Sequence, residues 1–133
     1  MVALNRKHLQ KLATIRLREA KILLSGNAPD GAYYLAGYSL ECALTACIAK
    51  FTKRHDFPDK DRVKDSYIHD LAKLINVADL KSVHTDAMQH LEFALRWKIV
   101  IKWSEASRYG ANSLDEAKEL IEAIENPRYG VFP

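Results

Sequence analysis

Apolar residues recur every three or four positions along most of the chain, the spacing that lines one face of an α-helix. The first such segment covers residues 5–25, and its apolar positions are Leu9, Leu12, Ala13, Leu17, Ala20 and Leu24. Asn5 is a suitable N-cap, and Gly26 suits the left-handed turn that ends many helices. The pattern therefore predicts a helix over residues 5–25.

Residues 32–53 are apolar almost all the way round, as expected for the central helix of a bundle. The segment follows the turn signal Pro29-Asp30-Gly31 and contains small residues that would let neighbouring backbones approach closely. Glu41 is its polar exception. A carboxylate among apolar neighbours must reach water at the helix edge, find a partner or take up a proton. A structural polar role for Glu41 is favoured over that of a general acid.

In the second half of the chain, the helical spacing of apolar residues covers shorter segments with more interruptions. Residues 54–65 (RHDFPDKDRVKD) predict an exposed loop, after which Ser66 can cap a short helix to about Asn76. A longer helix is predicted into Trp97 from the spacing of Val83, Ala87, Leu91, Ala94 and Leu95. The sequence leaves open whether residues 99–101 extend it. A connection over residues 104–112 then leads to a capping box, residues 113–116, that opens a final helix ending before Pro127.

Every long segment has a helical period, and no turn of the Asn-Gly or Asp-Gly type separates alternating strands. We therefore predict an all-α fold, an up-and-down bundle of four to five helices that forms a single domain over residues 1–133.

The composition agrees with one ordinary globular domain. The 133 residues include 48% hydrophobic ones, and 20 Lys and Arg against 17 Asp and Glu give a net charge of +3. A helix would point Cys42 and Cys47 to different sides, so we expect no disulfide between them and a cytoplasmic protein. The N-terminal residues do not predict a secretory signal, and charged residues interrupt the most apolar stretch, so we expect no membrane span.

Charge is distributed unevenly along the chain. Residues 5–25 carry six Arg and Lys against one Glu, whereas residues 104–127 carry six acids against two bases. The first helix thus has the strongest basic face, on which Arg16 and Arg18 are candidates for contacting phosphates. A merely solvated charged face is the simpler interpretation, and both stay open. The basic first and acidic last helices are expected to lie side by side, or one of them to meet a partner.

Standard signatures of enzymes are absent from the sequence. It contains no phosphate-binding Gly-rich loop, no HExxH, no CxxC pair and no G-x-S-x-G. The step from His84 to His90 turns the two imidazoles away from a common helix face, and neither these residues nor His69-Asp70 have an obvious further ligand. We expect no metal and no cofactor.

The order of the remaining motifs resembles that of a HEPN domain. These motifs are a first helix ending before a Gly, the helix Gly31-Ala32-Tyr33-Tyr34-Leu35-Ala36-Gly37-Tyr38-Ser39-Leu40-Glu41-Cys42-Ala43-Leu44, His69-Asp70-Leu71 at the start of a short helix, and Arg108-Tyr109 ahead of a capped last helix. The resemblance spans nearly the whole chain. It implies a helical bundle that forms a homodimer, binds nucleotides or RNA, and acts beside a partner such as a minimal nucleotidyltransferase in a toxin–antitoxin or defence setting.

The resemblance also implies a catalytic motif, an Arg followed a few residues later by a His, as in metal-independent ribonucleases. The His would move a proton while the Arg stabilises charge on the phosphate. Arg62 and His69 are the nearest match, although six residues separate them and Val63 stands where a polar residue is expected. The competing interpretations are that Arg62 is a solvated loop charge and that His69 is a structural histidine.

Arg108 and Tyr109 fall in a connection, where packing constrains residues less and functional residues concentrate. Arg108 could pair with a phosphate while Tyr109 stacks on a base. The competing interpretation is that Arg108 bridges to Glu41 or Asp70 and locks the connection. Asp70 is a further candidate for the binding site, and would favour a helix start whatever its function.

The sequence leaves three hypotheses for the function. The first is a nucleotide- or RNA-binding module acting with a partner, the second a metal-independent endoribonuclease, and the third a non-catalytic interaction or dimerisation domain.

Overall fold

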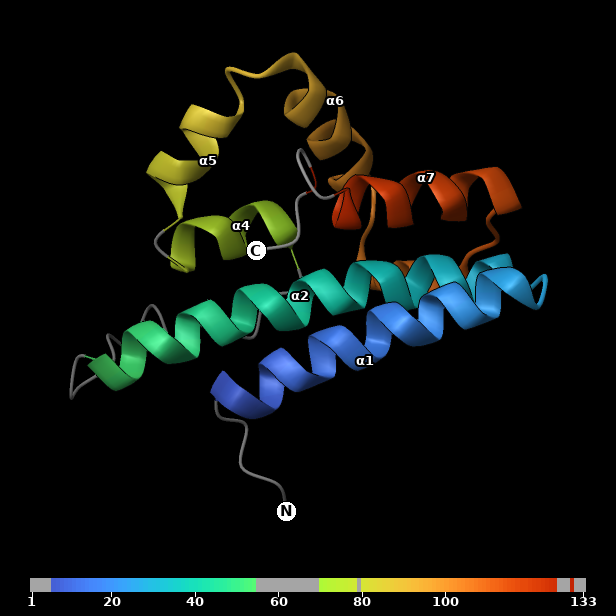
Figure 1. Ribbon diagram of the computed structural model, residues 1–133, viewed down its shortest axis with the longest axis horizontal. Coiled ribbons are helices and arrows are strands. Elements are labelled where there is room, and N and C mark those ends of the chain that lie inside the picture. The colour runs from blue at the N-terminus through green and yellow to red at the C-terminus, as the bar shows by residue number, and fades with distance from the viewer. Residues whose placement is uncertain (1–5, 55–69, 79, 127–129, 131–133) are drawn as a thin grey trace.

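The protein is an all-α bundle in which two long antiparallel helices support a second layer of shorter ones (Figure 1). The computed structural model describes residues 6–54, 70–78, 80–126 and 130. Helices α1 (Arg6–Ser25) and α2 (Pro29–Arg54) form the long pair. The second layer contains α4 (Leu71–Val77), α5 (Lys81–Ala87), α6 (Leu91–Val100) and α7 (Leu114–Glu125), and the 3₁₀ helix η1 (Glu105–Tyr109) lies against α2. The predicted fold class is confirmed.

The core is built around α2, as its apolar composition predicts. The main cluster of buried side chains takes members from α1, α2, α4, α6 and α7, and Leu40, Leu44 and Leu120 are fully buried within it. Trp97 and Trp103 are both buried and anchor the core. Within the described residues, no helix combines the length and the apolar character required to cross a membrane.

The turn between α1 and α2 differs from the prediction that Gly26 would be the left-handed residue. The left-handed residue is Asn27, with φ 61°, and not Gly26. The amides of Asn27 and Ala28 donate to the carbonyls of Leu24 and Leu23, at 3.1 and 2.8 Å. These are the two hydrogen bonds of a Schellman motif with Asn at the left-handed position, which Asn tolerates better than most residues do. Helix α2 then begins at Pro29, where the fixed φ of proline suits the first helical position.

Two other predicted helix starts have different outcomes. The capping box at the start of α7 is confirmed, because Ser113 Oγ accepts from the Glu116 amide at 3.1 Å and the Glu116 carboxylate accepts from the Ser113 amide at 3.0 Å. Ser66 lies outside the described residues, and α4 does not begin there but at Leu71. Asp70 has an extended conformation there and caps the helix, its carboxylate accepting from the Lys73 amide at 3.1 Å.

The predicted helix from Val83 into Trp97 is in fact two helices. Residues 88–90 form a turn in which the amides of Gln89 and His90 donate to the carbonyls of Asp86 and Ala87. His90 then adopts an extended conformation and α6 begins. The described residues therefore contain six α-helices, whereas four to five were expected. Helix α6 continues through Val100, and Ile101 is its C-cap, which answers the open question about residues 99–101.

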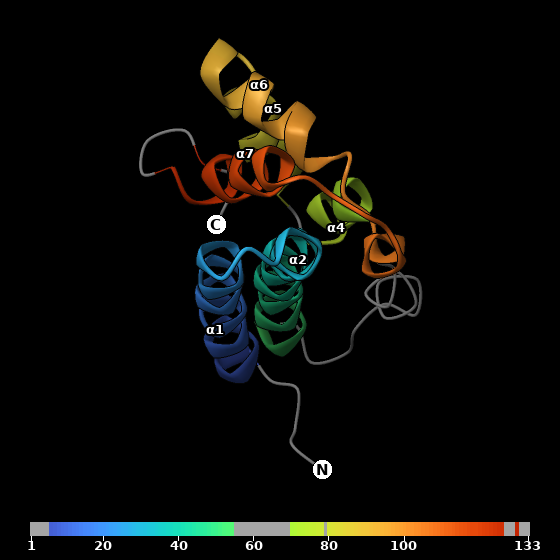
Figure 2. The ribbon, with the colours of Figure 1, turned by 90° about the vertical axis from the view of Figure 1, so that its right-hand side faces the viewer.

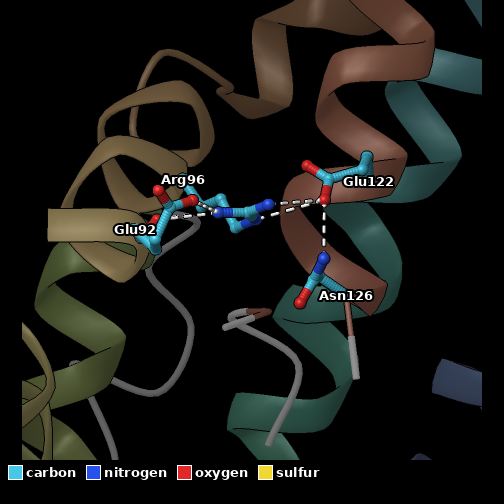
Figure 3. Close-up of polar contacts among 4 residues, drawn as sticks. All are labelled: Glu92, Arg96, Glu122 and Asn126. Carbon is cyan, nitrogen blue, oxygen red and sulfur yellow. Dashed lines mark hydrogen bonds and ion pairs between the residues drawn. The ribbon is translucent and has the colours of Figure 1, made fainter. Parts of the chain in front are cut away.

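The expectation that the first and last helices lie side by side is confirmed. Helices α1 and α7 are in contact, and Lys21 Nζ lies 2.8 Å from Glu125 Oε2. Helix α7 also packs on α2 and α6. An exposed polar network joins α7 to α6, with Arg96 at its centre and Glu92, Glu122 and Asn126 around it (Figure 3).

Candidate nucleic-acid interface

Arg108 and Tyr109 lie at the end of η1 and form a single exposed unit. The Cζ of Arg108 is 4.8 Å from the centroid of the Tyr109 ring, a cation–π contact, and the tyrosine is 80% exposed. Arg108 Nη2 also lies 3.6 Å from Glu105 Oε1. The pKa of Arg108 is raised, mainly by Tyr109, so its guanidinium stays charged. The unit therefore offers a permanent positive charge beside an accessible aromatic ring.

The short helix η1, which carries this unit, is stabilised by hydrogen bonds among its own neighbouring residues. Ser104 and Ser107 form a reciprocal capping box, in which the Ser104 amide donates to Ser107 Oγ at 3.3 Å. The Gly110 amide donates back to the Ser107 carbonyl at 3.1 Å. Two hydroxyl side chains thus fold a connection of the chain into a compact turn and leave Arg108 and Tyr109 on its surface.

Trp103 fixes this turn to α2. It is buried and lies directly over Gly37, and its ring stacks with Tyr34 at a centroid distance of 6.1 Å. Tyr34 in turn stacks with Tyr38, one helical turn further along, at 6.0 Å. Figure 2 shows η1 and α1 on opposite sides of α2. Both tyrosines are partly exposed.

The two tyrosines of the stack contribute to the pKa of two arginines named in the sequence analysis. The pKa of Arg16 is raised, first by its hydrogen bond to Glu19 and to a smaller extent by Tyr38. Tyr34 makes a small contribution of the same sign at Arg108. Each tyrosine of the stack thus has a small effect on the pKa of one of these arginines.

The basic face of α1 is partly neutralised. Arg16 is paired with Glu19 and Lys21 with Glu125. Arg18 is exposed, as are Arg6, Lys7 and Lys11. The exposed cations of this face lie chiefly toward the beginning of α1, and they supply positive charge on an element adjacent to the aromatic stack.

Asp70 has a structural role as the N-cap of α4. One carboxylate oxygen satisfies the Lys73 amide at the start of α4, which is a complete structural role for this side chain. A role for Asp70 in binding remains only a prediction. The ion pair that Arg108 makes in the structure is with Glu105, the residue one turn before it in η1.

Glu41 is buried, with 7% of its surface exposed, so it does not reach water freely at the helix edge. It lies beside Cys42, whose pKa burial raises to about 11, with a smaller contribution of the same sign from Glu41. Burial likewise raises the pKa of Tyr38, and Glu41 adds to that effect. The structural role assigned to Glu41 stays a prediction. No disulfide joins Cys42 to Cys47, as expected.

The two catalytic candidates cannot be placed, because Arg62 and His69 lie outside the described residues, as do residues 55–65 of the expected loop. Arg54, the first residue of that loop in the prediction, is the last residue of α2. No group of three or more His, Cys, Asp or Glu side chains within the described part of the chain is placed to hold a metal ion.

His84 and His90 have separate structural positions. The His84 ring packs edge-on against Trp97 at 4.5 Å and against Phe93 at 5.9 Å, and its Nε2 is buried without a hydrogen bond. Burial lowers the pKa of His84. His90 is the exposed N-cap of α6.

Sequence reasoning missed Tyr34 and Tyr38 as members of the interface. The signal available was their spacing of four residues, which places both rings on one face of a helix. No protein-family model matches this chain, and neither a curated protein nor a solved structure was found to match it.

Proposed function

We propose that this chain is a HEPN-like nucleotide- or RNA-binding module. The observation that carries the proposal is the exposed pair formed by Arg108 and Tyr109, in which a charged guanidinium lies over one face of an accessible ring. Protein sites for single-stranded RNA commonly combine a cation for the phosphate with an aromatic side chain for the base. The other ring face of Tyr109 can stack on a base while Arg108 pairs with the adjoining phosphate.

Two further features support the proposal. The Tyr34–Tyr38 stack extends the aromatic surface along α2 from the turn that carries Arg108. The exposed cations of α1, Arg18 among them, add the longer-range attraction that a polyanion requires.

The cellular setting of the proposal comes from the order of motifs along the chain. That order supports a cytoplasmic homodimer acting with a partner such as a minimal nucleotidyltransferase, in a toxin–antitoxin or defence context. The helical fold agrees with this expectation at the level of fold class.

The test is binding of a short fluorescein-labelled single-stranded RNA, followed by fluorescence anisotropy in the presence of EDTA. Replacing Arg108 and Tyr109 together by Ala should weaken binding by about tenfold or more, since a charge-assisted contact and a stacking contact are both lost. Lys118→Ala removes an exposed charge from α7 and is the matched control. Equal affinity of the double variant and the wild type would refute the proposal.

Competition with unlabelled ATP extends the same experiment to nucleotides. If ATP displaces the RNA from the wild-type protein, the site accepts a single nucleotide. If only unlabelled RNA competes, the site requires a polymer.

A further inference from the structure

One face of α1 carries a row of exposed cations. Lys7, Lys11 and Arg18 follow one another at intervals of four and seven residues, with the exposed Thr14 between the last two, so they lie on one side of the helix. We term these three cations the α1 stripe. Helix α1 packs on α2 and, near its end, on α7 (Figure 1), and the stripe lies on the face that these contacts leave exposed.

The charge of the α1 stripe is not balanced within its helix. Helix α1 has a net charge of +5, whereas the whole chain carries +3. Glu19, its one acid, is paired with Arg16, and Lys21 is paired with Glu125 of α7. The ion pairs formed among the described residues therefore leave the α1 stripe without a neutralising partner.

These cations are placed against the electrostatics of their own helix. The first turn of α1 contains Arg6 and Lys7 and no acid, although the N-terminal end of a helix favours negative charge. Lys7 and Lys11 are one turn apart, a spacing at which like charges repel. Positions at which a sequence works against its own fold are characteristic of functional sites. This placement favours a binding surface over a merely solvated face.

The composition of α1 indicates the chemistry of the ligand. The helix contains no Phe, Tyr or Trp, and the large hydrophobic side chain that it exposes is Ile22, at the other end. A protein partner would need apolar or aromatic anchors, and a membrane surface would need an apolar face to insert. A phosphate backbone requires only cations. The α1 stripe therefore suits a nucleic acid.

The absence of aromatic side chains also distinguishes α1 from the Arg108–Tyr109 unit. Unpaired bases are held by stacking on aromatic rings, which Tyr109 offers and α1 does not. In a duplex the bases already stack on one another, and the phosphates of both strands give a dense row of negative charge. The α1 stripe matches the duplex, and the Arg108–Tyr109 unit matches unpaired nucleotides.

The two sites are far apart on the protein. Figure 2 shows α1 and η1 on opposite sides of α2. Ala13 of α1 shares a buried cluster with Cys42, whereas Trp103, which precedes η1, lies over Gly37. Because α1 and α2 are antiparallel, Lys7 is level with a point about 16 Å beyond Gly37 along the axis of α2. A single nucleotide therefore cannot contact both sites.

We propose that the α1 stripe binds the phosphate backbone of an RNA duplex. The inference rests on the proposed function and names its ligand more closely. That ligand is an RNA with a paired stem along α1 and unpaired nucleotides at Arg108 and Tyr109.

A blunt RNA duplex of about ten base pairs, close to one helical turn, tests the stripe without unpaired bases. Fluorescence anisotropy of the labelled duplex in EDTA measures the affinity. The triple variant Lys7→Gln, Lys11→Gln, Arg18→Gln should bind the duplex about tenfold or more weakly than the wild type. The slope of log affinity against log salt concentration should decrease by about two to three units, since each lost phosphate contact removes about one. Glutamine is as good a helix former as lysine and arginine.

The matched control removes the same number of positive charges from other helices. It is the triple variant Lys73→Gln, Lys98→Gln, Lys118→Gln, whose exposed lysines lie on α4, α6 and α7. It should bind the duplex as tightly as the wild type, which separates the α1 stripe from an effect of net charge. Denaturation in urea should show that the α1 variant is at least as stable as the wild type, because repulsion within α1 is relieved.

Three results would overturn the proposal. The first is a wild-type chain that does not bind the duplex. The second is an α1 variant that binds it as tightly as the wild type, which would leave an acidic protein as the partner of the stripe. The third is an equal loss of affinity in the control variant, which would show that only net charge matters.

The Arg108→Ala, Tyr109→Ala variant separates this proposal from the proposed function. It should bind the blunt duplex like the wild type and lose affinity only for single-stranded RNA. Retained affinity for single-stranded RNA would refute the proposed function and leave the duplex result standing. A loss of duplex affinity as large as that of the α1 variant would contradict the separation of the two sites and overturn the present proposal.

Discussion

Gly37 and Trp103 are in direct contact, and the absence of a side chain at Gly37 is what makes room for the indole. A Cβ built on Gly37 would overlap the ring of Trp103 at three of its atoms. Gly37 is inside α2 and does not have a positive φ, so its role is close approach and not an unusual backbone conformation. The contact fixes the position of η1, and with it the position of Arg108 and Tyr109.

Replacing Gly37 by Ala should destabilise the protein by about 1–3 kcal/mol, the usual cost of forcing an extra group into a packed site. Denaturation in urea, followed by circular dichroism, measures the free energy of unfolding. Gly31→Ala is the control, because the added Cβ would meet only the movable end of the Leu23 side chain. Its stability should stay within about 1 kcal/mol of the wild type. Equal stability of the two variants would contradict the packing role of Gly37.

Asp70 provides a test that separates a cap from a binding residue. Asp70→Ala removes the acceptor for the Lys73 amide and should cost about 1 kcal/mol of stability, whereas Asp70→Asn keeps an acceptor and should cost less. Thermal unfolding of both variants gives the comparison. RNA affinity measured on Asp70→Asn should equal that of the wild type. A large change in affinity with intact stability would show that the charge of Asp70 takes part in binding.

His84 should make stability depend on pH. Its pKa is lowered by burial in the folded protein, so the unfolded chain binds the proton more readily. The contribution of neutral His84 to folding stability is present above the ordinary pKa of histidine, about 6.5. It is lost as the pH falls toward the lower pKa that His84 has in the folded protein. The urea concentration at the unfolding midpoint should therefore decrease as the pH is lowered from 7.5 to 5 in the wild type. The decrease should be smaller in His84→Leu. Parallel curves for the two proteins would exclude His84 as the source.

The sequence predicted the elements whose signals are local. The capping box at Ser113 was readable because a hydroxyl and a carboxylate three residues apart satisfy each other's backbone amides, with no help from the rest of the fold. The buried face of α7 also has a local pattern, since Leu120 and Ile124, four residues apart, both lie in the core. The apolar composition of α2 likewise identified the centre of the bundle.

The break between α5 and α6 could not be predicted in the same way. Leu91 and Leu95 continued an apolar period, but that period belongs to an exposed face, so it gave no information on where the helix packs. The turn at residues 88–90 contains neither Gly nor Pro to announce it. Packing decides the geometry here, since Trp97 and Val100 must face the core while His84 reaches back to Trp97.

The candidate interface was predicted in part. Arg108 and Tyr109 were found because they interrupt the helical periods. The stack of Tyr34, Tyr38 and Trp103 depends on residues far apart in sequence, and only the folded chain brings Trp103 to α2.

The salt dependence of RNA binding tests the Arg108–Tyr109 interface most directly. Each phosphate contact releases counterions, so the logarithm of affinity should fall linearly with the logarithm of salt concentration. Arg108→Gln should reduce that slope by about one unit, because one phosphate contact is lost. Tyr109→Ser should lower the affinity at every salt concentration and leave the slope unchanged, since stacking involves no counterion. Slopes and affinities that match the wild type in both variants would contradict the account.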